Sequence, residues 1–328
     1  MGLRDGVRMS GAKRPAIDGR ILDARAQLLA VQGARQPSIT TLDPVTARSA
    51  TSEGLSLLDG APRSGVEVQP LEVPGPGGPL DARLYLPAGS TGPLPGLVFF
   101  HFGGCVIGDL DTCHTFCSMI SDIAGIAVLN VAYRLAPEHR FPAQVHDAVA
   151  AYRWAQGNAE DLRMIPGRIG VGGDSAGGYL SAVVAQEAKR EGFEAPALQL
   201  LIYPVTDWGW KGGSMESCAN VYPLTAEIME WFGAHYLNAA SEKDDVRVSP
   251  MKEADLSGLA PAIIVTAGFD PLRDQGAAYA EKLKAAGVSV AYSCEDSLPH
   301  AFTAMTGVIP AANAACERIA RDIGAALR

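Results

Sequence analysis

The chain has 328 residues, of which 48% are hydrophobic and 19% are charged, and its formal net charge at pH 7 is −9. A chain of this length and composition can bury a sizeable core, so we exclude global disorder and expect one large α/β domain or two smaller ones. An acidic surface repels nucleic acid and anionic membranes, so we expect neither as a partner.

The predicted elements begin with a helix over residues 20–34, where apolar residues recur at helical spacing. Residues 35–64 are irregular and polar, with some helix expected near 43–50. Short apolar runs typical of strands then alternate, from the third run onward, with helical stretches. The predicted strands are 66–71, 82–86, 96–101, 127–132, 168–172, 197–203, 262–267 and 288–293, and the predicted helices are 112–124, 142–157, 176–191, 271–286 and 311–327.

The middle strands of this series are apolar throughout, which is typical of parallel strands buried on both faces. Strand–helix alternation of this length predicts a doubly wound, mostly parallel sheet. Residues 205–250 interrupt it, since they hold three of the four tryptophans and one predicted helix near 224–238. We interpret them as an insertion that forms a cap with the N-terminal helix; the alternative is an ordinary long crossover. The expected division is an N-terminal cap segment (1–64), a main α/β domain in two parts (65–204 and 251–328) and an inserted cap segment (205–250).

The cellular location and the need for a metal are predicted from sequence features that we do not find. No apolar run of about 18 residues could span a bilayer, and the charged stretch 1–20 has no apolar block behind it to form a secretory signal. The six cysteines include no CxxC pair, so we expect reduced thiols and a cytoplasmic location. Cys113, His114 and Cys117 have no second cluster to complete a ligand set, so we expect no metal.

The stretch "IGVGGDSAGGYLSAVVA" from Ile169 to Ala185 places a serine between a predicted strand and a predicted helix. Gly173, Ser175 and Gly177 fit the pattern G-x-S-x-G, in which glycines allow a sharp turn that lifts the hydroxyl clear of the sheet. The backbone N–H of Ala176, at a helix N-terminus, can donate to an oxyanion. The alternative is a helix N-cap serine after a glycine-rich turn.

A glycine turn follows the third predicted strand in "FFHFGGCVIG". Its consecutive residues Gly103 and Gly104 let backbone N–H groups turn toward a bound carbonyl oxygen. Alone this is an ordinary turn, but together with the serine motif it predicts the other half of an oxyanion hole.

The serine's partners are expected later in the chain, in the order acid then histidine. Asp270 lies just past a buried strand in "TAGFDPLRD", where it could also cap a helix beginning at Pro271. His300 follows the last strand in "DSLPHAF". Asp174 adjoins the serine and is too close to it in sequence to orient the histidine, so we interpret it as a structural tie for nearby loops, toward the glycine loop.

With these motifs the sequence resembles a known family, the bacterial hormone-sensitive-lipase-like carboxylesterases of the GDSAG subtype, within the α/β-hydrolases. The matching stretches, which span residues 80–305, are "HFGGCVIGDLDT", "VAYRLAPEHRFPAQVHDA", "IGVGGDSAGG", "GFDPLRDQG" and "LPHAF". The resemblance implies an α/β-hydrolase fold with an eight-stranded, mostly parallel sheet, flanking helices and a helical cap. It also implies a triad of Ser175, Asp270 and His300, with oxyanion donors at Gly103, Gly104 and Ala176.

Two positions depart from the family pattern. Phe102 stands where the family usually has the first of three glycines, and its ring could reshape the loop or the acyl pocket. Ala301 stands where the family usually has glycine after the histidine. A methyl group is tolerable there unless the backbone needs a positive φ.

The expected function is carboxylic ester hydrolysis on short-to-medium acyl esters, by a cofactor-free acyl-enzyme mechanism. The alternatives are a non-catalytic small-ligand-binding protein on the same fold, or an amidase or lactonase using the same triad. The predicted pocket walls are Phe102, Trp208, Tyr222 and Leu224, although aromatic residues there could equally form the core of the cap. The resemblance also implies a possible homodimer joined through the last strand, "VSVAYS", whose apolar edge would otherwise need protection.

Overall fold

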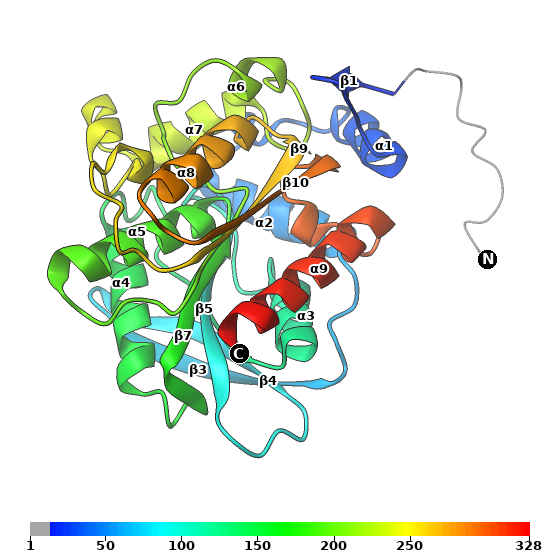
Figure 1. Cartoon of the computed structure of the whole chain (residues 1–328). Helices are drawn as coiled ribbons and strands as arrows, with labels where there is room; N and C mark the ends of the chain where they lie inside the picture. The colour runs from blue at the N-terminus through cyan, green and yellow to red at the C-terminus, as the bar shows by residue number, and fades with distance from the viewer. Residues whose placement is uncertain (1–13) are drawn as a thin grey trace.

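The computed structural model of the chain describes residues 14–328, so most of the N-terminal stretch discussed above lies outside the described residues. Its centre is an eight-stranded sheet of order β10-β9-β8-β7-β5-β6-β4-β3 (Figure 1). Within this eight-stranded sheet, the strand pairs β3–β4 and β4–β6 are antiparallel and the other pairs are parallel. The strands are β3 (Val66–Gly75), β4 (Gly78–Pro87), β5 (Leu94–Phe100), β6 (Ala127–Val131), β7 (Met164–Asp174), β8 (Gln199–Ile202), β9 (Ala262–Phe269) and β10 (Val290–Pro299).

Burial of the strands follows their place in the sheet. Strands β6, β8 and β9 are buried at every residue, which explains their unbroken apolar runs. Strand β10 lies at one edge and is largely exposed over its first half. The prediction of eight strands in a mostly parallel sheet is therefore confirmed.

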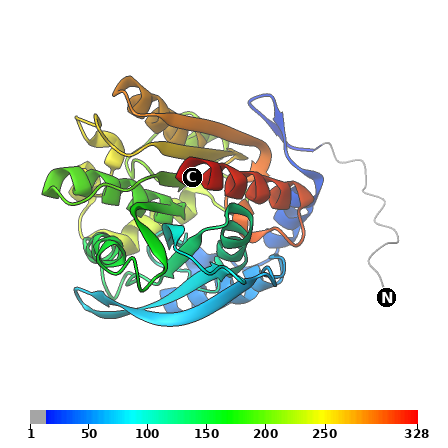
Figure 2. The ribbon, with the colours of Figure 1, turned by 60° about the horizontal axis from the view of Figure 1, so that its bottom comes forward.

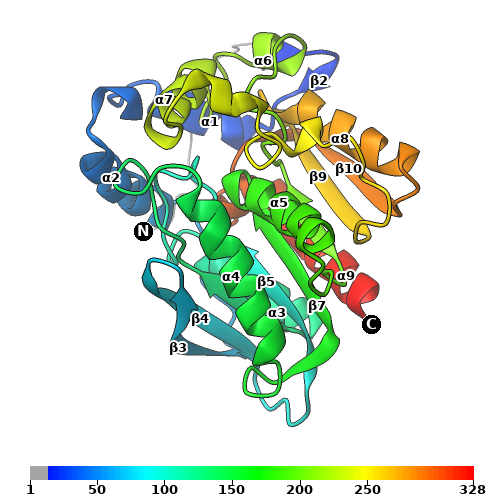
Figure 3. The same cartoon turned by 90° about the vertical axis from the view of Figure 1, so that its left-hand side faces the viewer.

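Helices cover both faces of the sheet. Helices α3 (His114–Ala124) and α9 (Pro310–Leu327) pack against each other on one face, as Figure 2 shows. Helices α4 (Ala143–Gly157), α5 (Ala176–Glu191) and α8 (Arg273–Ala285) lie on the other face, turned toward the viewer in Figure 3. None of the helices within residues 14–328 is both long enough and apolar enough to cross a bilayer.

The N-terminal elements and the insertion meet at one end of the molecule (Figure 3). Thr40 donates a hydrogen bond to Glu227 (2.8 Å), and Ser217 donates one to Asp18 (3.0 Å). The two segments expected to form a cap therefore contact each other. Their elements are β1 (Ala16–Ile17), β2 (Arg20–Ile21), α1 (Ala24–Gly33) and α2 (Pro44–Ser56) from the N-terminal part, and α6 (Ser214–Ser217) and α7 (Ala226–Tyr236) from the insertion.

Most predicted bounds differ from those of the structure by one to four residues, and several strands, among them β3, β4 and β10, extend further than predicted. Two helix starts have an identifiable physical context. The first helix begins at Ala24 rather than at residue 20, because β1 and β2 form a small hairpin before it. Asp23 then caps this helix by accepting the N–H groups of Arg25 and Ala26. Helix α8 begins at Arg273 rather than at Pro271.

Candidate active site

Ser175 stands on a sharp corner between β7 and α5. Its backbone has φ 53° and ψ −113°, a conformation that few non-glycine residues adopt. A side chain at Gly177 would overlap the carbonyl group of Phe100, and one at Gly173 would overlap both that carbonyl and Gly177 itself. The two glycines of the motif are therefore required by close packing of the corner against β5.

The serine hydroxyl does not cap the helix that it precedes, since its side chain makes no capping hydrogen bond with α5. It lies instead 3.0 Å from Nε2 of His300. The alternative of a simple N-cap serine is thus wrong, and the hydroxyl is free to react.

His300 is held from its other side by Asp270. The ring nitrogen Nδ1 lies 2.7 Å from Oδ2 of Asp270, which is fully buried. With Nδ1 donating its proton to this carboxylate, Nε2 is left as the acceptor for the Ser175 hydroxyl. Asp270 does not cap α8, but its Oδ1 accepts the N–H of Leu272 (2.8 Å), which fixes the carboxylate.

Topology brings these three side chains together from distant parts of the chain. Ser175, Asp270 and His300 directly follow β7, β9 and β10, which are parallel to one another. The carboxyl ends of parallel strands meet at one edge of a sheet, where ligands bind in open α/β folds. The hydroxyl, the imidazole and the carboxylate therefore form one connected chain of hydrogen bonds, as expected from the sequence.

Three backbone N–H groups near the serine are oriented by the carbonyl groups of their own peptide units. The Phe102 carbonyl accepts a hydrogen bond from Nδ1 of His101 (2.7 Å). The Gly103 carbonyl accepts hydrogen bonds from the N–H groups of Val106 and Ile107 (2.9 and 3.0 Å). The Ser175 carbonyl accepts one from the N–H of Tyr179 (2.9 Å). In a planar trans peptide the N–H points opposite to the C=O. Within residues 14–328, the N–H groups of the following residues, Gly103, Gly104 and Ala176, have no hydrogen-bond acceptor, so they are available to a bound oxyanion.

The histidine that supports this loop is itself buried. Burial lowers the pKa of His101, which favours the neutral ring with its proton on Nδ1. Its ring stacks on that of Tyr133 with centroids 4.4 Å apart, and the Tyr133 hydroxyl donates to the His101 carbonyl (2.8 Å). His101 belongs to the same glycine-loop motif, but its sequence pattern does not reveal this packing.

Ala301 has φ 58°, so the backbone after the histidine does adopt the left-handed conformation in which glycine is favoured. Such a conformation costs a residue with a side chain roughly 1–2 kcal/mol. This departure from the family pattern therefore places a small strain directly beside His300.

Asp174 is tied to the histidine loop rather than to the glycine loop. Its carboxylate accepts hydrogen bonds from Thr303 (2.8 Å) and Tyr203 (3.0 Å), and the Cys113 thiol lies 3.6 Å from it. The Tyr203 ring packs against His300 with centroids 4.6 Å apart. Thr303 and Tyr203 were not singled out from the sequence, although Thr303 lies only three positions after the histidine.

The four residues expected to line the pocket lie in different surroundings. The Trp208 ring packs near Tyr236, with centroids 5.3 Å apart, and Leu224 is buried in the same apolar cluster. Tyr222 lies against Gly33 at the end of α1, and Phe102 is buried beside the glycine loop. These contacts belong to the packing of the cap and loop, and a substrate-binding role for the four residues stays a prediction.

A residue of α7 that was not expected from the sequence lies against the glycine loop. A side chain at Gly104 would overlap the ring of Phe232, so this ring covers the Cα atom of a proposed oxyanion donor. Phe232 is itself buried. No sequence signal distinguishes it from other apolar residues of an amphipathic helix.

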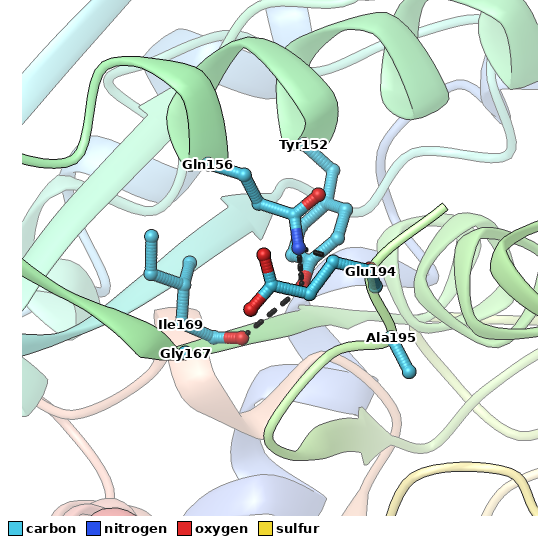
Figure 4. A pocket seen from close by; sticks show the side chains of 6 residues that line it. All are labelled: Tyr152, Gln156, Gly167, Ile169, Glu194 and Ala195. Atoms are coloured by element: carbon cyan, nitrogen blue, oxygen red, sulfur yellow. Dashed lines mark hydrogen bonds between the residues drawn. The ribbon is translucent and has the colours of Figure 1, made fainter. Parts of the chain in front are cut away.

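The described residues contain no group of three or more His, Cys, Asp or Glu side chains arranged to hold a metal ion. His114 instead contacts the Tyr85 hydroxyl (2.9 Å). A small hollow elsewhere is lined by Tyr152, Gln156 and Glu194, among others (Figure 4). This hollow lies toward the amino end of β7, whereas Ser175 follows the carboxyl end, so the hollow is not part of the site. Within the hollow, the Gln156 amide donates a hydrogen bond to the Tyr152 hydroxyl (3.0 Å).

Comparison with known proteins shows similarity to the α/β-hydrolase family and to ester hydrolases. A family model described as the α/β-hydrolase fold matches residues 97–304. The carboxylic ester hydrolase LipN of Mycobacterium tuberculosis is 43% identical over 303 residues, covering 90% of this chain and 80% of that protein. An ethyl acetate hydrolase of Pseudomonas putida is 40% identical over 238 residues, covering 71% and 74%.

Solved structures are similar over almost the whole chain. An esterase of Pyrobaculum calidifontis has a TM-score of 0.85 and 34% identity, covering 93% of this chain and 98% of that one. An ester-hydrolase from the metagenome of Lake Arreo, complexed with a derivative of bipyridine phosphonate, has a TM-score of 0.90 and 35% identity, covering 93% and 99%.

Proposed function

Because the chain belongs to the α/β-hydrolase family and is a carboxylic ester hydrolase, we propose that Ser175, His300 and Asp270 carry out this hydrolysis through an acyl-enzyme. The observation that carries the assignment is the continuous hydrogen-bonded chain from the Ser175 hydroxyl through His300 to Asp270, with distances of 3.0 and 2.7 Å. No other serine was predicted to occupy such a corner.

In the first half-reaction, Ser175 Oγ attacks the acyl carbon while Nε2 of His300 takes its proton. The Asp270 carboxylate stabilises the imidazolium that forms and keeps the ring in place. The oxyanion accepts hydrogen bonds from the N–H groups of Gly103, Gly104 and Ala176. His300 then gives its proton to the leaving alcohol, and the C–O bond of the ester breaks.

In the second half-reaction, water replaces the alcohol. His300 takes a proton from the water, whose oxygen attacks the acyl carbon, and the same N–H groups hold the second oxyanion. Returning the proton to Ser175 Oγ breaks the acyl–serine bond and releases the carboxylic acid. Every step uses groups of this chain and water, so the proposed mechanism requires no cofactor.

The substrates that fit this site are esters of short-to-medium acyl chains. Ser175 and His300 are each only 5% exposed, so the reacting groups are enclosed rather than on an open surface. The aromatic residues Phe102 and Phe232 flank the glycine loop and restrict the space beside it. The small substrate in the name of the ethyl acetate hydrolase relative agrees with this size range.

We place the enzyme in the cytoplasm, without a nucleic-acid or membrane partner. All six cysteines are free thiols, five of them buried, which fits a reducing compartment. The net charge of −9 disfavours binding to polyanions.

The experiment that tests this proposal is a panel of p-nitrophenyl esters from acetate to palmitate, measured with the wild-type protein and Ser175→Ala. We expect the wild type to prefer acyl chains below about ten carbons. Loss of the nucleophile is expected to lower kcat by about 10⁶-fold without a change in folding. Full activity of the variant would exclude Ser175, and a preference for long acyl chains would contradict the restricted pocket.

A further inference from the structure

We propose that Arg48, on helix α2, is a positioning residue for the oxyanion hole, because its guanidinium group holds the backbone that aims the Gly104 N–H at the substrate. This inference rests on the function proposed above and deepens it. Arg48 lies outside residues 97–304, which the family model matches. The N-terminal segment would then contribute to catalysis through its contacts with the backbone beside the glycine loop.

The Arg48 guanidinium group makes four hydrogen bonds in three directions. Nε donates to the carbonyl of Val106 and Nη2 to the carbonyl of Ala136, both at 2.8 Å. Nη1 and Nη2 also donate to the two carboxylate oxygens of Glu138, at 2.9 and 2.6 Å. The planar guanidinium group is suited to such a fork, whereas an ammonium group is a compact point charge on a flexible stem.

The backbone that carries each of the two carbonyl groups also donates a hydrogen bond to the glycine loop. The unit between Val106 and Ile107 accepts from Arg48 through its C=O and donates through the Ile107 N–H to the carbonyl of Gly103 (3.0 Å). Ala136 accepts from Arg48 through its own C=O and donates through its N–H to the carbonyl of Cys105 (2.8 Å). Arg48 thus fixes backbone on both sides of Gly104.

The carbonyl of Gly103 and the N–H of Gly104 belong to one planar peptide unit. Any rotation of this unit that weakens the bond from Ile107 to the Gly103 carbonyl also turns the Gly104 N–H away from the oxyanion. Gly104 has φ 59° and no side chain, so its own conformation resists such a rotation little. The N–H groups of Val106 and Ile107 hold the Gly103 carbonyl, and Arg48 in turn holds the peptide unit between these two residues.

Without the arginine, two buried carbonyl groups would lose their partners. Val106 and Ala136 are both fully buried, and no other donor within residues 14–328 reaches their carbonyl oxygens. An unsatisfied buried acceptor is costly, so the loop would rearrange to find other partners or water. That rearrangement would disturb the oxyanion hole before it unfolded the protein.

The experiment compares Arg48→Met, Arg48→Lys and Glu138→Gln, with Arg63→Met as the matched control. Arg63 likewise joins the N-terminal segment to the body of the molecule, but its hydrogen bonds go to Glu317 (2.9 Å) and Ser118 (2.9 Å) rather than to the glycine loop. We measure kcat and KM for p-nitrophenyl butyrate, and Ki for a trifluoromethyl ketone, whose serine adduct carries an oxyanion. Thermal unfolding reports stability.

We expect Arg48→Met to lower kcat by about 10- to 100-fold, a fraction of the effect of losing an oxyanion donor, with KM within about twofold of the wild type. The Ki for the ketone should rise by a similar factor. Arg48→Lys should also lower kcat, because an ammonium cannot serve both carbonyl groups and Glu138. Glu138→Gln and Arg63→Met should keep kcat within about twofold, because both leave the two carbonyl bonds of Arg48 in place.

Wild-type kcat in Arg48→Met would overturn the inference, and so would an equal loss of kcat in Glu138→Gln or Arg63→Met, which would indicate general docking of the N-terminal segment. If Arg48→Met does not fold, Arg48→Lys decides by the same criteria. Ser175→Ala separates the two proposals: activity in that variant would refute the proposed mechanism, whereas an inactive Ser175→Ala beside a fully active Arg48→Met would refute the role of Arg48 alone.

Discussion

At the scale of single residues, the least expected feature is a second buried carboxyl group beside the triad. Asp174 is completely buried next to the nucleophile and accepts hydrogen bonds from Thr303 and Tyr203. Burial raises its pKa to about 6, although the hydrogen bonds from Thr303, Tyr203 and Cys113 and the nearby His300 oppose this shift. At neutral pH the protein therefore carries a buried charge that its partners only partly stabilise.

This raised pKa makes a testable contribution to stability. The folded protein keeps the Asp174 proton at pH values between the ordinary pKa of 3.8 and about 6, where the unfolded chain has lost it. The stabilising effect of that proton is present at low pH and is lost as pH rises toward 6. This effect is worth on the order of 3 kcal/mol at most.

We therefore expect Asp174→Asn, which cannot ionise, to become more stable relative to the wild type as pH rises from 4 to 7. Urea unfolding at several pH values measures this difference in free energy of unfolding. Asp81→Asn is the control, because that carboxylate is exposed. A wild-type-to-variant difference that stays constant over this range would show that Asp174 has no raised pKa.

The residues that carry the chemistry could be predicted because their order and local patterns are specific. Ser175, Asp270 and His300 each follow a predicted strand in the order that this topology requires. Arg48 and Thr303 carry no such pattern, since their roles depend on which carbonyl or carboxylate they meet in the folded chain. The φ of 58° at Ala301 could be anticipated only as a condition, because one sequence does not reveal a backbone angle.

At the scale of elements, helix α7 places the ring of Phe232 against Gly104. Because this ring lies beside a proposed oxyanion donor, it is positioned to limit the length of the acyl chain. We expect Phe232→Ala to shift the optimum of kcat/KM toward longer acyl chains, measured on the same p-nitrophenyl ester panel.

The matched control for this change is Trp231→Ala, because Trp231 is the neighbouring aromatic residue on α7 and packs against His235 with centroids 4.4 Å apart. An unchanged profile in Phe232→Ala would remove the ring from the acyl pocket. A similar shift in both variants would indicate that loosening of α7, rather than removal of one ring, changes the preference.

Long periodic elements were predictable, whereas short ones were not. Helix α5 begins and ends where its apolar spacing indicates, at Ala176 and Glu191. The hairpin of β1 and β2 was missed because each strand has only two residues. Its turn does carry a signal, since Asp18 and Gly19 both have positive φ (52° and 77°), and the dipeptide Asp-Gly is favoured in such turns.

At the scale of the whole molecule, the fold followed from alternation of strands and helices, and the comparisons confirm the α/β-hydrolase fold and ester hydrolysis. Contacts between the N-terminal segment and the insertion could not be derived in detail. They join side chains far apart in sequence, such as Thr40 and Glu227, and no periodic pattern encodes them.

The exposed edge of β10 provides a prediction for the assembly. We propose that two chains pair through this strand, because it ends the sheet and leaves Tyr292 36% exposed. Light scattering should then give twice the mass of one chain, and Tyr292→Glu should shift it to one chain. Leu57→Glu, at an apolar residue 79% exposed elsewhere on the molecule, should leave the dimer intact. A monomeric wild type would contradict the proposal.

Covalent trapping of the nucleophile is the most direct measurement. After brief treatment with an organophosphorus fluoride, intact-protein and peptide mass spectrometry would report how many groups are attached and at which residue. We expect one phosphyl group per chain, located on Ser175, with activity lost in parallel and no labelling of Ser175→Ala. Turnover of esters that persists while Ser175 stays unmodified, or a stoichiometric adduct on another residue, would show that a different group attacks the acyl carbon.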